Sequence, residues 1–294
     1  VLNRVIMNAK RASAPAQLNI PRDMWTQVID VELPAIVEFE RPSGGEQAIA
    51  QAAELLSNAK NPVILNGAGV VLSHGGIDAS RALAERLDAP VCVGYQHNDA
   101  FPGSHPLFAG PLGYNGSKAG MELISEADVV LCLGTRLNPF STLPGYGMEY
   151  WPADAKIVQV DINPDRIGLT KKVSVGIVAD AAKAAKGIMD RLSETAGDDG
   201  RAERKAKIAE KKSRWAQQLS SMDHEDDDPG TSWNERARAD KPDWMSPRMA
   251  WRAIQSALPT EAIISSDIGN NCAIGNAYPA FEEGRKYLAP GLFG

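Results

Sequence analysis

Short apolar runs alternate with helical patterns through the middle of the chain. Five runs rich in Val, Ile and Leu follow one another as PVILNGAG, APVCVGY, ADVVLCLGTR, AKIVQVDI and VSVGIVAD. Most of the gaps between them carry apolar residues at helical spacing, as in IDASRALAERL and SKAGMELISEA. Similar patterns precede the first run, in EQAIAQAAELLSNA, and follow the last, in AAKAAKGIMDRL. Apolar strands that do not alternate, interleaved with helices, indicate a parallel sheet covered on both faces. Residues 41–192 are therefore predicted to form a doubly wound α/β domain.

Segments of different character flank the predicted α/β domain. Residues 1–40 begin with an amphipathic helical pattern, and AQLNIPRDMW then predicts a short strand that leads into an extended exit segment. Residues 193–244 are highly charged and poor in apolar residues, which is typical of an exposed helix in a linker. In residues 245–294, the helical pattern SPRMAWRAIQSALP and the apolar run EAIISSD predict the start of another unit. We therefore expect partial α/β domains on both sides of the central one.

Net charge and cysteine content limit which binding partners and which cellular location the sequence suggests. A net charge of −6 gives no sign of a nucleic-acid-binding protein or of attraction to an anionic membrane. No apolar stretch reaches the roughly 18 residues of a membrane-spanning helix, and no signal-peptide pattern is visible. Cys92, Cys132 and Cys272 lie far apart without a CxxC motif, and the first two stand inside apolar runs. We therefore expect reduced thiols and a cytoplasmic location.

The turn after the first apolar run contains two glycines. Gly67 and Gly69, in LNGAGVVLSHGG, make a GxG, but the third glycine of the dinucleotide-binding fingerprint is missing. A tight strand-to-helix turn that needs positive φ explains this pair more simply than a nucleotide site does. The prediction for the two glycines is therefore a conformational role.

Two charged residues follow later strands. Arg136 ends the run ADVVLCLGTR, where it could hold an anionic group through both guanidinium nitrogens or form an ion pair in a domain interface. Asp161 ends the run AKIVQVDI, where it could cap the helix that follows or meet a ribose hydroxyl. The cap is the favoured interpretation of Asp161, and both alternatives stay open for Arg136.

A long loop rich in Gly and Pro, residues 94–121, leaves the carboxyl end of a predicted strand. Ligands of parallel sheets bind at that edge, and long loops in compact domains are often functional. The loop carries His97, Asn98, Asp99 and His105, whose spacing matches no strong metal-ligand pattern. We therefore expect a functional loop without a metal site.

The stretch SSDIGNN follows the last predicted strand. Gly269 allows a sharp turn, and the amides of Asn270 and Asn271 could donate hydrogen bonds to an anion. If a helix begins there, its N-terminus adds a favourable field for negative charge. The residues alone leave two interpretations open, a phosphate site and an ordinary Gly-Asn turn.

Together these segments resemble thiamine-diphosphate-dependent enzymes of the acetohydroxyacid synthase type, which have a pyrimidine-binding, a central and a diphosphate-binding α/β domain. PAQLNIPRDMW resembles the exit of the first domain, DVVLCLGTR and KIVQVDINPDRIG resemble the central domain, and IISSDIGNN resembles the first strand and turn of the third. The resemblance implies thiamine diphosphate and Mg²⁺ as cofactors of the full-length protein. In such enzymes the cofactor carries the difficult chemistry, and the protein supplies placement and charge.

The same resemblance assigns cofactor-binding residues. Gly269, Asn270 and Asn271 match the turn that contacts the cofactor diphosphate in the family. Gly291 and Gly294, in the segment PGLFG, match the start of a second glycine-rich turn near the cofactor. The glutamate that activates the cofactor and the metal-binding motif have no match within the chain. The glutamate is expected upstream of residue 1, and the metal-binding motif is expected downstream of residue 294.

Longer strings, such as HNDAFPGSHPLFAGPLGYNGSKAGM and TRLNPFSTLPGYGMEYWP, resemble the branch of the family that cleaves sulfoacetaldehyde. This resemblance implies that sulfoacetaldehyde and phosphate, the two small-molecule partners, give acetyl phosphate and sulfite. It also implies a homodimer or homotetramer of the full-length protein. The 294 residues are therefore expected to be a fragment of a roughly doubled chain and to be inactive when isolated.

Alternative functions stay open beside this resemblance. One keeps the family and changes the substrate to pyruvate, as in acetolactate synthases. Another treats the chain as a nucleotide-binding or oligomerisation module. Some relatives bind FAD or ADP in the central domain, and Gly67, Arg136 and Asp161 fall in comparable places, so they are candidate substrate or nucleotide contacts.

Overall fold

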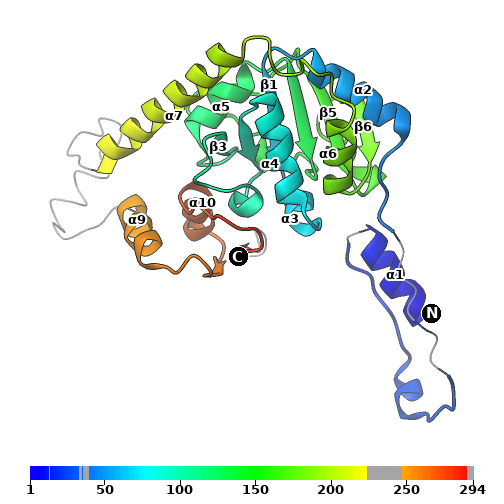
Figure 1. Ribbon diagram of the computed structural model, residues 1–294. Helices are drawn as coiled ribbons and strands as arrows, with labels where there is room; N and C mark the ends of the chain where they lie inside the picture. Colours follow the sequence, from blue (N-terminus) through cyan, green and yellow to red (C-terminus); the bar gives the residue numbers. More distant parts are fainter. Residues whose placement is uncertain (13, 33–34, 36–39, 224–246, 290–294) are drawn as a thin grey trace, which may run out of the picture.

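A computed structural model describes residues 1–12, 14–32, 35, 40–223 and 247–289 of the chain. Its centre is a six-stranded sheet in which every neighbouring pair of strands is parallel. Figure 1 shows helices packed around this sheet, with the N-terminal segment extending away from it. The predicted doubly wound α/β fold is confirmed.

The sheet has the strand order β3-β2-β1-β4-β5-β6. Its strands are β1 (Pro62–Asn66), β2 (Val91–Val93), β3 (Phe108–Pro111), β4 (Val129–Leu133), β5 (Lys156–Asp161) and β6 (Val175–Val178). All five residues of β1 and of β4 are buried, because both strands lie inside the sheet and both faces are covered. This explains why the two strands appear in the sequence as apolar runs without alternation. The edge strand β6 alternates between buried and exposed residues instead.

Strand β3 is the part of the sheet that the sequence did not predict. It lies within the loop expected over residues 94–121, has four residues, and pairs with β2 through a register shift next to Cys92. Gly110 within it has φ +97°, and Pro111 ends it. Gly and Pro are poor strand formers and are tolerated at an edge, where one side of the strand needs no partner.

The helices of the central domain match the predicted helical patterns. They are α2 (Glu46–Ser57), the short α3 (Ala68–Leu72), α4 (Gly76–Leu87), α5 (Lys118–Ser125) and α6 (Ala181–Met189), with 3₁₀ turns at Asn98–Ala100, Pro139–Ser141 and Pro164–Arg166. Helix α4 packs against α6, and α6 packs against α2. Figure 1 shows α4 and α6 in front of the sheet. The apolar faces of these helices cover the strands, and Leu56, Leu83 and Ile188 are fully buried there.

Helix α7 (Arg201–Asp223) lies along α5 and does not extend freely from the domain. Lys207 and Lys211 form ion pairs with Glu126, which follows α5. Ile208 is 3% exposed and belongs to the core of the domain, and Arg204 is 4% exposed. The segment predicted as an exposed linker helix is therefore helical, and its first turns are docked on the central domain.

The N-terminal segment contains α1 (Leu2–Ala12) and a 3₁₀ turn at Arg22–Thr26. The helix was predicted, but the strand expected from AQLNIPRDMW is wrong: residues 16–21 have no regular structure. A strand is stabilised by pairing with a neighbour, and no described strand lies beside these residues. The apolar residues Trp25 and Val28 are exposed by 70% and 98%.

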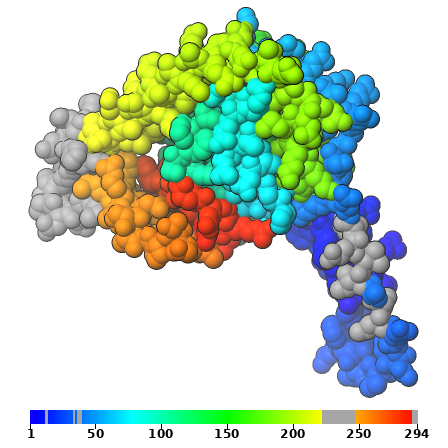
Figure 2. Space-filling view, in the orientation of Figure 1, coloured from blue at the N-terminus to red at the C-terminus, as the bar shows by residue number. Residues whose placement is uncertain are grey.

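The C-terminal unit contains α9 (Pro247–Ala257), β7 (Ile264–Ser265), α10 (Asn270–Ala277) and β8 (Tyr287–Leu288). Strands β7 and β8 form a parallel pair. Figure 2 shows the described end of the C-terminal unit, in red, lying against the cyan and green atoms of the central domain. Across all residues that the structure describes, no helix is long and apolar enough to cross a lipid bilayer.

Candidate functional site

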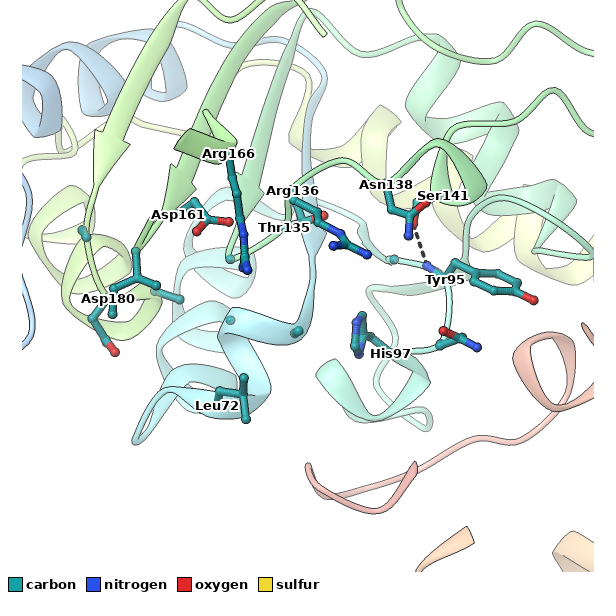
Figure 3. Close-up of a pocket in the computed structure, with 18 of the residues that line it drawn as sticks. Leu72, Tyr95, His97, Thr135, Arg136, Asn138, Ser141, Asp161, Arg166 and Asp180 are labelled. Atoms are coloured by element: carbon teal, nitrogen blue, oxygen red, sulfur yellow. Dashed lines mark hydrogen bonds between the residues drawn. The ribbon is translucent and has the colours of Figure 1, made fainter. Parts of the chain in front are cut away.

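A cavity of about 300 Å³ lies at the carboxyl edge of the sheet (Figure 3). The segments that follow β1, β2, β4, β5 and β6 all contribute to its lining, because parallel strands end at the same edge. The strand order reverses between β1 and β4, and ligands of open α/β sheets bind at such a switch point. The volume lies at the lower end of the roughly 300–1,000 Å³ that small-molecule sites occupy.

Glycines bring the turns after β1 and β4 into contact at the back of the cavity. Gly67 has φ −126° and Gly69 is not among the residues with positive φ, so the predicted need for positive φ is wrong. The reason for glycine is space: a Cβ on Gly67 would lie 2.6 Å from Cβ of Thr135, and one on Gly69 would lie 2.5 Å from Cα of Gly134. Gly134 itself has φ +57°, in the left-handed region that favours glycine.

Two arginines make the cavity suited to an anion. Arg136 follows β4 and Arg166 follows β5, and Figure 3 shows both side chains extending into the cavity. Within the described part of the chain, neither guanidinium forms an ion pair with a carboxylate. An arginine with a free planar edge binds phosphate or sulfonate oxygens through two parallel hydrogen bonds. For Arg136, the geometry therefore agrees with the anion interpretation and does not place it in an ion pair.

Two titratable groups of the cavity have shifted pKa values. Burial and the nearby positive charge of Arg136 lower the pKa of His97 to about 4, so its imidazole is neutral at physiological pH. Burial raises the pKa of Asp161, although the hydrogen bond from the Asn163 N–H and the charge of Arg166 act against it. The lining thus offers guanidinium donors, a neutral imidazole and the carboxyl groups of Asp161 and Asp180, of which Asp180 is paired with Arg41.

Asp161 does not cap the helical turn that follows it, so the favoured interpretation is wrong. Its carboxylate accepts a hydrogen bond from the Asn163 N–H at 2.9 Å. The cap of the turn at Pro164–Arg166 is Asn163, whose side chain accepts from the Asp165 N–H at 3.0 Å. Asp161 is 4% exposed and lines the cavity instead.

The loop after β2 connects the cavity with the C-terminal unit. The N–H of Tyr95 donates to Oγ of Ser141 at 2.9 Å (Figure 3). The ring of Tyr95 stacks on Phe140. Tyr95 and Gln96 line the cavity, and both side chains also contact Sγ of Cys272 in α10. The sequence marked this loop as functional but gave no sign that it reaches helix α10.

His97, His105 and Asp99, all in this loop, contact different parts of the molecule. Asp99 is 2% exposed and accepts from the backbone N–H groups of Lys286 and Tyr287. His105 lies 3.1 Å from Glu85, and His97 faces the cavity. Within the described ranges, no group of three or more His, Cys, Asp or Glu side chains could hold a metal ion.

The turn that begins α10 fits an anionic group such as a diphosphate. Gly269 has φ +86° and ψ −146°, a conformation that only glycine adopts easily, and no atom lies within 4 Å of where its Cβ would be. Asn270 and Asn271 are exposed at the first positions of the helix, whose first N–H groups have no partner within a helix. Open space, free N–H donors and two amides therefore meet at one point. Gly291 and Gly294, assigned from resemblance, lie outside the described residues.

The cysteines have the surroundings expected from the sequence. Cys92 and Cys132 are fully buried in the strands, and Cys272 is 3% exposed. Burial raises the pKa of the Cys92 thiol to about 12 and that of Cys132 as well. A thiol that does not ionise is a poor nucleophile, so the two strand cysteines serve as small apolar residues.

Comparison with known proteins places the central part of the chain in a family. Residues 49–188 match the family described as thiamine pyrophosphate enzyme, central domain. Over all 294 residues the chain is 80% identical to a sulfoacetaldehyde acetyltransferase of Roseovarius nubinhibens. Residues 49–188 therefore belong to the family of thiamine pyrophosphate enzyme central domains. The matched residues coincide with the six-stranded sheet and its helices, so the cavity lies in the central domain of such an enzyme.

Other relatives within the thiamine pyrophosphate enzymes differ in identity and coverage. A sulfoacetaldehyde acetyltransferase of Rhodobacter capsulatus is 73% identical over the whole chain. A probable acetolactate synthase large subunit of Methanocaldococcus jannaschii is 32% identical over 185 residues, which are 60% of this chain and 31% of that protein. The chain spans about half the length of the first two relatives, 49% and 50%.

Proposed function

We propose that this chain is part of a thiamine-diphosphate-dependent sulfoacetaldehyde acetyltransferase, which converts sulfoacetaldehyde and phosphate into acetyl phosphate and sulfite. The observation that carries the proposal is the 80% and 73% identity, along the whole chain, to two proteins of that name. The acetolactate synthase relative matches a shorter part at 32% identity. Similarity of this degree favours sulfoacetaldehyde over pyruvate as the substrate.

The diphosphate of the cofactor would be held at the start of α10. Gly269 leaves open space there, and Asn270, Asn271 and the first N–H groups of the helix would donate hydrogen bonds to its oxygens. When bound, thiamine diphosphate supplies the carbanion chemistry that an aldehyde cleavage requires. The positive end of the helix dipole would stabilise the negative charge of the diphosphate by about 0.3–1 kcal/mol. We also propose Mg²⁺ as the counterion, a dimer or tetramer of the full-length protein, and a cytoplasmic location.

The test is sulfite release from sulfoacetaldehyde in the presence of phosphate, thiamine diphosphate and Mg²⁺. A polypeptide of the relatives' full length is compared with the 294-residue chain. Sulfite from the long polypeptide alone supports both the assigned reaction and the expected inactivity of the shorter chain. If the long polypeptide forms acetolactate from pyruvate and releases no sulfite from sulfoacetaldehyde, the assignment of sulfoacetaldehyde as the substrate is overturned. Turnover by the 294 residues would overturn the expected placement of the catalytic glutamate and metal motif.

The cavity supports a second proposal, an adenine nucleotide bound in the central domain. Gly69 and Gly134 line the cavity without side chains, Arg136 and Arg166 suit the phosphates of a nucleotide, and Asp161 could accept from a ribose hydroxyl. A cavity of about 300 Å³ favours ADP over the larger FAD. Calorimetric titration with ADP and with FAD tests this. Arg136→Gln is expected to weaken ADP binding at least about tenfold, since one charged hydrogen-bonded contact is lost, and no binding of either nucleotide would overturn it.

A further inference from the structure

Helix α10 depends on its surroundings for its position. It has eight residues, and isolated helices shorter than about 12 residues are marginal in water. Its own sequence, NNCAIGNA, includes three asparagines and a glycine, which are weak helix formers. The turn that would hold the diphosphate therefore has a fixed position only if other parts of the molecule hold the helix.

The loop after β2 contacts α10 near both of its ends through buried and partly buried hydrogen bonds. At its start, Nε2 of Gln96 donates to Sγ of Cys272 at 2.8 Å. At its end, Oδ1 of Asn276 accepts from the Gln96 N–H at 2.6 Å, and Nδ2 of Asn276 donates to the Tyr114 carbonyl at 3.2 Å. Nδ2 of Asn98 donates to the Asn276 carbonyl at 2.6 Å. Asn276 is fully buried and Asn98 is 1% exposed.

The same loop holds the strand pair beside the helix. The carboxylate of Asp99 accepts from the N–H groups of Lys286 and Tyr287 at 3.0 and 3.4 Å. Tyr287 begins β8, which pairs with β7, and β7 leads directly to the turn at Gly269. Three residues within four positions of the loop, Gln96, Asn98 and Asp99, therefore bind the helix after the turn and the strand that pairs with β7 before it. Gln96 has φ +68°, a conformation that costs a non-glycine residue about 1–2 kcal/mol and so requires support from these contacts.

We propose that Gln96, Asn98 and Asp99, with Asn276 as their partner, are positioning residues for the diphosphate-binding turn. They act through α10 and do not touch the cofactor. This inference rests on the proposed cofactor site. The apparent affinity for thiamine diphosphate is proportional to the fraction of molecules in which α10 is correctly placed. Loss of these contacts lowers that fraction and therefore weakens binding.

The test is Asn276→Ala in a polypeptide of the relatives' full length. Alanine favours helix and adds no atoms, so the substitution removes the two side-chain hydrogen bonds without weakening the helix itself. Calorimetric titration with thiamine diphosphate and Mg²⁺ is expected to show a Kd raised about tenfold. At saturating cofactor, kcat is expected to return to the wild-type value, because the bound cofactor restores the position of the helix. General damage to the fold would lower kcat at every cofactor concentration.

Matched variants make the outcome decisive. Ser104→Ala removes the hydrogen bond from the hydroxyl of this loop residue to Glu282, beyond the end of α10, and should leave the Kd within about twofold. If the Asn276→Ala variant does not fold, the same titration with a Gln96→Asn variant tests the positioning role. Asparagine tolerates the positive φ of this position but is too short to reach Cys272, and a Kd raised about threefold is expected.

The possible failures are distinguishable. If the wild-type protein does not bind thiamine diphosphate, the proposed function is overturned, and the positioning role with it. If the wild type binds and the folded variants bind equally well, the positioning role alone is overturned. An equal loss of affinity in Ser104→Ala would also overturn it, because the effect would then belong to the whole interface and not to the helix.

Discussion

Asp180 shows how one side chain joins three elements beside the cavity. Its Oδ1 caps α6 by accepting from the Ala182 N–H at 3.1 Å and also accepts from the Ser73 hydroxyl, and Arg41 pairs with Oδ2 at 3.1 Å. Burial alone would raise the pKa of this 6%-exposed residue, but the hydrogen bonds from Ser73 and Arg41 outweigh burial, and the pKa is lowered. The charged carboxylate is therefore stabilising in the folded state.

Asp180→Asn is expected to lower the free energy of unfolding by about 1 kcal/mol near pH 7, because the ionic hydrogen bonds are lost while a capping oxygen remains. A lowered folded pKa gives stability that is present above the unfolded value of about 3.9 and is lost as the pH falls through the folded value. The difference between wild type and variant should therefore shrink below about pH 4. Urea unfolding at several pH values measures this. Asp154→Asn, at an exposed aspartate, should show no such trend.

Arg204 is a buried arginine in a highly charged stretch, where no sequence pattern distinguishes it from its neighbours. Its guanidinium donates to five backbone carbonyls, those of Lys60, Leu87, Asp88, Gly197 and Asp199. Arg204→Met should lower the free energy of unfolding by about 3 kcal/mol, since these acceptors lose their donors inside the protein. Arg204→Lys should lose nearly as much, because an ammonium cannot reach five carbonyls.

The control for Arg204 lies two turns or more further along the same helix. Arg214 is 54% exposed and pairs with Glu122 and Glu210 at the surface. Arg214→Met should change the free energy of unfolding by less than about 1 kcal/mol. Equal losses in the two methionine variants, measured by urea unfolding, would contradict the role given to Arg204.

At the scale of elements, the two turns at the back of the cavity depend on each other. Gly69→Ala would place a Cβ 2.5 Å from Cα of Gly134, so α3 must move away from β4. We expect a loss of about 2–3 kcal/mol in the free energy of unfolding. Gly45→Ala, where no atom lies within 4 Å and φ is −74°, should cost less than about 1 kcal/mol in the same urea titration.

The sequence predicted elements best where burial is complete. The fully buried strands β1 and β4 and the amphipathic helices α2, α4 and α6 were evident from apolar pattern alone. The edge strand β3 and the two-residue β8 were not, because short strands are defined by pairing rather than by composition. The residues of the candidate site were likewise predictable only in part. Residues at strand ends, such as Arg136 and Asp161, were foreseen, whereas the contacts of Gln96 and Asn276 depend on the tertiary fold.

At the scale of the whole molecule, the 294 residues leave large apolar side chains uncovered. In the N-terminal segment Trp25, Val28 and Ile29 are exposed by 70%, 98% and 73%, and in α9 Ile254 is exposed by 45%. Uncovered apolar surface of this kind promotes association. We expect the isolated chain to self-associate as its concentration rises, as measured by light scattering after size exclusion. A monodisperse monomer at high concentration would contradict this expectation, and a Trp25→Ser, Val28→Ser variant should associate less.

The docking of α7 also sets how short a working version of the central domain could be. The apolar pattern suggests stopping at residue 192, after the last helix of the sheet. Such a polypeptide would expose the carbonyls that Arg204 satisfies and the core surface that Ile208 covers. A version intended for crystallisation or ligand screening should therefore start near residue 41 and continue beyond Ile208. Its extra residues would bind the carbonyls of Lys60 and Leu87, just before β1 and β2, at the edge of the sheet away from the cavity.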